Sequence, residues 1–128
     1  MAKEMKAKMV VVIEDDESYR AAVGRLLKSA GFPVRTFGSV EEFLESGQQH
    51  ETGCLIADIR MPGMSGLDLQ TKLKAEHCQI PTIFITAHGD EKMRLQAMRN
   101  GAVKFLVKPF DSGILLEGVR MALETEDS

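Results

Sequence analysis

Short apolar runs alternate about five times with longer stretches that carry apolar residues at helical spacing. Apolar runs bounded by Gly, Pro or charged residues predict buried strands. We expect five strands, at residues 9–13, 33–37, 53–57, 81–85 and 103–107. The helical spacing predicts five helices, at about 17–30, from Ser39, from Ser65, at 90–100 and at 111–123. Ser39 and Ser65 are each followed three residues later by an acid, which is the spacing of a capping box.

Strands that alternate with helices of this length form a parallel sheet with right-handed crossovers. The first, third and fourth strands are nearly all apolar, which is typical of central strands covered on both faces. The second strand contains Pro33 and Arg35 and the fifth contains Lys104, which edge strands tolerate. We therefore predict an α/β fold, a doubly wound five-stranded parallel sheet with the flavodoxin-like order 2-1-3-4-5.

The composition is typical of a globular domain. The 128 residues are enough for one core and too few for two, so we expect a single domain over 1–128, with a core at about 9–123. A net charge of -3 argues against a nucleic-acid surface. No apolar stretch has the length of a membrane span, and the charged start lacks the apolar region of a signal peptide. We expect a cytoplasmic protein with two reduced cysteines.

Polar side chains stand where four of the predicted strands end. Glu14 and Asp15 follow the first strand, Asp58 the third, Thr86 the fourth and Lys108 the fifth. The carboxyl ends of parallel strands meet at one edge of a sheet, where open α/β folds bind their ligands. Because the predicted order makes strands one and three neighbours, Asp15 is expected beside Asp58.

Carboxylates held close together repel one another, so they take up a proton or bind a cation. Ligands that are all oxygen favour Mg²⁺, which uses one or two carboxylates and retains several waters. Asp15 and Asp58 are expected as direct ligands, with the backbone carbonyl of Arg60 as a third. Glu14 is expected to act through a water molecule.

An aspartate can also act as a nucleophile and form an aspartyl-phosphate. The cation and Lys108 would then neutralise the oxygens of the transferring group, and the Thr86 hydroxyl would donate a hydrogen bond to it. Each residue alone has an ordinary explanation, such as a helix start, a turn or a solvated surface. Complementary groups at four strand ends favour the site interpretation.

Four segments resemble the receiver domain of bacterial two-component response regulators, at residues 11–17, 57–66, 83–87 and 105–110. The resemblance extends from about Met9 to Leu123 and implies the (β/α)5 receiver fold. The sequence around Asp58 and Thr86 is most similar to that of receivers that precede LuxR-type output domains. Glu14 and Asp15 match the acidic pair of the family, with Glu14 in place of the commoner Asp.

The resemblance implies that Asp58 accepts a phosphoryl group from a phosphohistidine on a sensor histidine kinase, with Mg²⁺ required. Thr86 would then move to the phosphoryl group and Phe105 would turn inward. This would change the surface of the fourth helix, the fifth strand and the fifth helix. The Lys108–Pro109 peptide is expected to be cis.

The expected partners are the sensor kinase, a downstream protein or output domain, and a second copy in a phosphorylation-dependent homodimer. We expect no enzyme activity beyond the protein's own phosphorylation and dephosphorylation. The initial Met and the polar tail favour a stand-alone receiver over a fragment of a transcription regulator. We also predict that Arg60 and His88, each two residues after a site residue, flank the attacking water and set the dephosphorylation rate.

Three other functions compete with this prediction. A phosphatase with an aspartate nucleophile usually needs a second acid two residues later, where this chain has Arg60. A receiver fold that only binds partners, without phosphorylation, would not need Asp15, Asp58, Thr86 and Lys108 together. A flavin- or nucleotide-binding sheet would need a Gly-rich phosphate loop after the first strand, where acids stand instead.

Overall fold

Strands and helices alternate along residues 9–125, the part of the chain that the computed structural model describes. The strands are β1 (Met9–Ile13), β2 (Val34–Phe37), β3 (Thr52–Asp58), β4 (Thr82–Thr86) and β5 (Lys104–Val107). The α-helices are α1 (Glu17–Ser29), α2 (Val40–Ser46), α3 (Gly66–Ala75), α4 (Glu91–Arg99) and α5 (Ser112–Thr125). A short 3-10 helix, η1 (Gln49–Glu51), precedes β3 and was not predicted.

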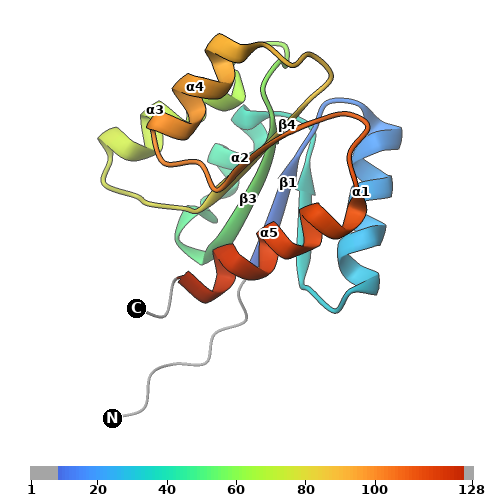
Figure 1. Cartoon of the computed structure of the whole chain (residues 1–128). Helices are drawn as coiled ribbons and strands as arrows, with labels where there is room; N and C mark the ends of the chain where they lie inside the picture. The colour runs from blue at the N-terminus through green and yellow to red at the C-terminus, as the bar shows by residue number, and fades with distance from the viewer. Residues whose placement is uncertain (1–8, 126–128) are drawn as a thin grey trace.

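All five strands are parallel and lie in the order β2-β1-β3-β4-β5, as predicted. Helices α1 and α5 cover one face of the sheet, and α2, α3 and α4 cover the other (Figure 1). Each face carries its own cluster of buried apolar side chains. The chain therefore buries both faces of the central strands, which explains why these strands are apolar along their length.

The edge strands differ from the central ones as the sequence predicted. Every residue of β3 and β4 is buried. In β2 the middle residues, Arg35 and Thr36, are exposed, and no residue of β5 is fully buried. Pro33 stands just before β2, where its carbonyl accepts a hydrogen bond from the Val10 N–H.

The two predicted capping boxes have different outcomes. Ser65 and Asp68 form both reciprocal hydrogen bonds at the start of α3. Ser39 also caps its helix, by accepting a hydrogen bond from the Glu42 N–H. The Glu42 side chain, however, accepts from the N–H of Gly38 rather than from that of Ser39. The second box is therefore half formed, although it marks the start of α2 correctly.

Within residues 9–125, no helix combines the length and the apolar character needed to cross a membrane.

Candidate functional site

The register of the sheet brings the predicted acids together. Ile13 pairs with Ala57, so Glu14 and Asp58, the next residues along β1 and β3, are neighbours. Asp58 in turn pairs with Ile85 of β4. The residue directly beside Asp58 in the register is thus Glu14, whereas Asp15, which was predicted there, is one residue further along and still has a carboxylate oxygen within 4.8 Å of one of Asp58.

Lys108 reaches both acids from the end of β5. Its Nζ atom lies 2.9 Å from Oε1 of Glu14 and 3.0 Å from Oδ2 of Asp58. The Lys108 backbone N–H donates to the carbonyl of Thr86 at 2.7 Å, which places the start of the following loop against β4. The Lys108–Pro109 peptide is cis, as expected. The Lys108 ammonium group therefore contacts two acids that lie 94 and 50 residues before it in the sequence.

Three carboxylates form a cluster that can hold a cation. Oxygen atoms of Glu14, Asp15 and Asp58 all lie within 4.8 Å of one another. Glu14 and Asp58 are buried, whereas Asp15 is exposed. The cluster therefore has two acids fixed by the protein and one that faces solvent. Oxygen-only donors of this kind fit Mg²⁺.

The charges of the site depend on burial and on hydrogen bonds. Burial is the largest influence on Glu14 and raises its pKa above the ordinary value, against the lowering effect of the Lys108 hydrogen bond. Burial alone would lower the pKa of Lys108, but its hydrogen bonds to Glu14 and Asp58 outweigh this and raise the pKa. Lys108 is therefore a cation at neutral pH, and its charge offsets part of the repulsion between the acids.

The other predicted residues differ in how far they are buried. Thr86 is fully buried, and its Oγ1 accepts a hydrogen bond of 3.2 Å from the His88 N–H. Phe105 is half-buried and packs against the core on the α2–α4 face. The Arg60 N–H donates to Oδ1 of Asp58 at 3.1 Å. The side chains of Arg60 and His88 are exposed.

Tyr19 contacts the site but was not predicted as part of it. Its place in the helical pattern of residues 17–30 indicated only a core-facing side chain. The Tyr19 ring lies beneath the Lys108 ammonium, 4.2 Å from Nζ to the ring centroid. Arg20, the next residue, donates from Nη1 to the Glu14 carbonyl at 2.8 Å. Helical spacing identified the right face of α1 but gave no sign of the lysine above it.

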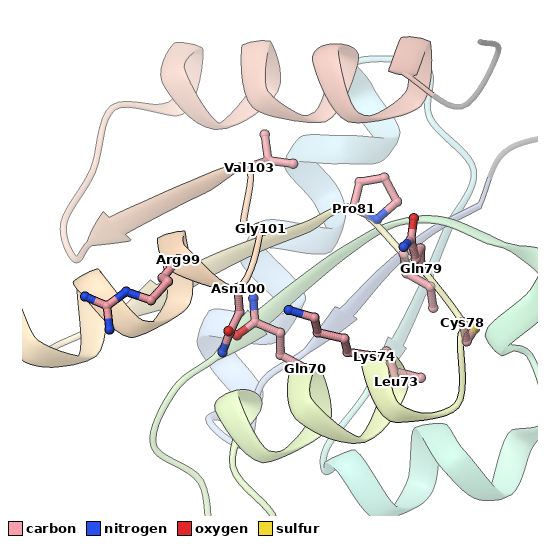
Figure 2. Close-up of a pocket in the computed structure, with 11 residues that line it drawn as sticks. Gln70, Leu73, Lys74, Cys78, Gln79, Pro81, Arg99, Asn100, Gly101 and Val103 are labelled. Carbon is pink, nitrogen blue, oxygen red and sulfur yellow. The ribbon is translucent and has the colours of Figure 1, made fainter.

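A pocket of about 540 Å³ lies away from the acids (Figure 2). Its lining includes Gln70 and Lys74 of α3, Asn100 after α4, and Pro81 and Val103 just before β4 and β5. It is thus at the amino ends of the strands, opposite the acidic cluster. It brings together none of the residues predicted for the site.

Comparisons with known proteins identify relatives over nearly the whole chain. Residues 10–120 match the family described as the response regulator receiver domain. The chain is 48% identical over 118 residues to nodulation protein W of Bradyrhizobium diazoefficiens, covering 92% of this chain and 52% of that protein. It is 40% identical over 114 residues to the transcriptional regulatory protein FixJ of Azorhizobium caulinodans, covering 89% and 54%.

Among solved structures, the response regulator StyR superposes with a TM-score of 0.86 and 46% identity, covering 93% of this chain and 60% of that one. The chain spans about half the length of the curated relatives that it matches.

Proposed function

The chain belongs to the response regulator receiver domain family, and from this membership we propose that Asp58 accepts a phosphoryl group from a phosphohistidine on a sensor histidine kinase. Receiver domains are signalling domains of two-component systems. In this proposal the domain promotes only its own phosphorylation and dephosphorylation and has no separate substrate. It acts in the cytoplasm and does not itself bind nucleic acid or a membrane.

The observation that carries the proposal is the contact between Lys108 and Asp58. A carboxylate whose Oδ2 lies 3.0 Å from an ammonium and whose Oδ1 accepts a backbone N–H is held in a fixed orientation. Asp58 is 6% exposed, so most of its surface is covered while a small part remains accessible. A nucleophile with a cation beside it suits phosphoryl transfer, which depends on positioning and on charge neutralisation.

The acidic cluster would hold Mg²⁺ through Asp15, Asp58 and the backbone carbonyl of Arg60, with Glu14 acting through water. When bound, Mg²⁺ supplies positive charge that offsets the charge on the phosphoryl oxygens. Asp15 suits direct binding because it is exposed beside two buried acids. Glu14 suits an indirect role because its Oε1 is already engaged by Lys108.

In the transfer step a carboxylate oxygen of Asp58 attacks the phosphorus atom of the phosphohistidine. The new P–O bond forms as the P–N bond to the imidazole breaks, and the departing imidazole takes up a proton from solvent. The Lys108 ammonium then shifts from carboxylate to phosphoryl oxygens, where it neutralises the added charge. The Thr86 hydroxyl donates a hydrogen bond to the same group.

The phosphoryl group acts as a switch because it adds about -1.5 to -2 charge and three strong acceptors. Thr86 Oγ1 accepts from the His88 N–H, and within residues 9–125 no acceptor takes its own hydrogen, so the hydroxyl can turn toward the phosphoryl group. Phe105, which is half-buried, then moves into the space that Thr86 leaves. Shifting the population from 1:99 to 99:1 takes about 5.5 kcal/mol, which several charge-assisted hydrogen bonds can supply together.

The surface controlled by this switch is the face formed by α4, β5 and α5. Large apolar side chains are exposed on these elements, at Leu95, Met98, Val107, Ile114 and Met121. We propose that this face contacts a downstream protein, an output domain or a second phosphorylated copy. An output domain is favoured by analogy with FixJ, which is a transcriptional regulatory protein.

The test is incubation with acetyl phosphate and Mg²⁺, followed by intact mass measurement of the wild type and of Asp58→Ala. We expect a mass gain of one phosphoryl group in the wild type alone, abolished by EDTA. Circular dichroism of both proteins checks that the variant is folded. No gain in either protein would favour a binding module that works without phosphorylation, and an equal gain in both would place the acceptor elsewhere.

A further inference from the structure

Tyr19 contacts the lysine of the proposed site through the face of its ring. The Lys108 Nζ lies 4.2 Å from the ring centroid, within the distance at which an aromatic face attracts an ammonium group. The same Nζ donates to Glu14 and to Asp58. Two carboxylates and one neutral ring therefore hold the lysine.

Tyr19 is itself held by two contacts. The backbone N–H of Tyr19 donates at 3.0 Å to the side chain of Asp16, which caps the start of α1. Its ring forms a T-shaped pair with the ring of Phe110, with centroids 6.3 Å apart and planes at 81°. Both aromatic residues pack against the core on the α1–α5 face. The position of the ring is therefore set by α1 and by the loop after β5 together.

Mg²⁺ and the phosphoryl group engage the carboxylates that hold Lys108, but they do not engage the Tyr19 ring. Mg²⁺ seeks oxygen ligands, so cation binding to Asp15 and Asp58 draws on the same acids that hold the ammonium. The added phosphoryl group changes Asp58 further. The face of an aromatic ring attracts an ammonium without carrying a net charge, so this contact remains when the acids are engaged.

We propose that Tyr19 is a positioning residue, whose ring keeps the Lys108 ammonium beside Asp58 while the acids bind a metal ion and a phosphoryl group. This inference rests on the proposed function. The ring face carries the role, because the Tyr19 hydroxyl has no hydrogen-bond partner within residues 9–125. Phenylalanine should therefore replace tyrosine, whereas an aliphatic side chain of similar size should not.

The experiment compares Tyr19→Phe with Tyr19→Leu and Tyr19→Met by the rate of mass gain in acetyl phosphate and Mg²⁺. We expect Tyr19→Phe to remain within about twofold of the wild type and the two aliphatic variants to be about 3- to 10-fold slower. Thermal unfolding identifies any variant that does not fold, and the second aliphatic variant then replaces it.

An independent readout uses the unphosphorylated protein. A ring stacked on an ammonium shifts the NMR signals of the adjacent methylene protons upfield. The Lys108 Hε signals should be shifted in the wild type and in Tyr19→Phe, and should return to ordinary values in Tyr19→Leu.

Equal rates in the aliphatic and Phe variants, or unshifted Lys108 signals in the wild type, would overturn this inference alone. A wild type that gains no phosphoryl group would overturn the proposed function and this inference together.

Discussion

The carboxylate of Glu41, in the first turn of α2, accepts a hydrogen bond of 2.9 Å from the backbone N–H of Met64. Met64 stands 23 residues further along, in the loop between β3 and α3. Gly63 beside it has φ +80, and a Cβ atom there would lie 2.7 Å from Oε2 of Glu41. One side chain of α2 therefore holds the loop that follows Asp58, and the left-handed backbone beside Met64 favours glycine at position 63.

We predict that Glu41→Ala releases this loop. The protection of the Met64 amide against hydrogen exchange should fall by about two- to tenfold, because its acceptor is lost. The matched control is Glu45→Ala, an exposed acid of the same helix for which residues 9–125 show no hydrogen bond to the loop. Unchanged protection in Glu41→Ala would show that packing alone fixes the loop.

Acidic pH should have the same effect on the wild type. The hydrogen bond from the Met64 N–H lowers the pKa of Glu41 below its ordinary value of 4.5. A depressed pKa means that the contribution of this carboxylate is present above about 4.5 and is lost as the pH falls through the lowered value. Protection of the Met64 amide, corrected for the intrinsic exchange rate, should follow this course. Glu41→Ala should show no such decrease.

Gly66 and Gly24 should respond in opposite ways to alanine. A Cβ atom on Gly66 would lie 2.5 Å from the Asp58 carbonyl oxygen and 3.1 Å from the Phe84 ring. Gly66→Ala should therefore lower the free energy of unfolding by about 1–3 kcal/mol. Gly24, inside α1, has only the Thr36 methyl group at 3.4 Å. Gly24→Ala should raise the free energy of unfolding by about 0.5–1 kcal/mol, since glycine destabilises the interior of a helix relative to alanine. Urea unfolding of the wild type and of the two variants measures these changes. Similar stabilities of the two variants would refute the close-packing argument.

Mg²⁺ should stabilise the folded protein through Asp15. A ligand at 100 times its Kd adds about 2.7 kcal/mol to the free energy of unfolding. Thermal unfolding with Mg²⁺ or EDTA should show this gain in the wild type and its loss in Asp15→Asn. The matched control is Asp16→Asn, because asparagine also caps a helix and should leave the gain intact. A full gain in Asp15→Asn would exclude Asp15 as a ligand.

Arg60 and His88 should set the lifetime of the aspartyl-phosphate. Their backbone N–H groups donate hydrogen bonds to Asp58 and Thr86, and both side chains are exposed. We predict that these side chains flank the path of the attacking water, so Arg60→Ala and His88→Ala should each change the decay rate after removal of acetyl phosphate. Intact mass measured over time gives the rate. Unchanged lifetimes in both variants would mean that the two side chains point only to solvent.

The order of apolar and polar positions determined the fold and most of the candidate site. Strands with apolar residues along their whole length must lie in the middle of a parallel sheet, and edge strands alone tolerate Arg35. That order makes the ends of β1 and β3 neighbours, so the acids after β1 were expected near Asp58, with Asp15 beside it. The register of the sheet then showed that Glu14 is the residue directly beside Asp58. The element ends that were predicted lie within about two residues of those in the structure, and the predicted caps Ser39 and Ser65 mark the starts of α2 and α3.

The tertiary structure decided which side chains touch at that edge. The ring of Tyr19 under Lys108 and the bond from Met64 to Glu41 join segments whose spacing in sequence carries no periodic signal. Such contacts depend on rotamers and loop paths, which packing against the rest of the molecule selects. Periodicity tells which face of an element is buried, because burial of apolar side chains is the main driving force that orients the element. Which neighbour each side chain meets there depends on the whole fold.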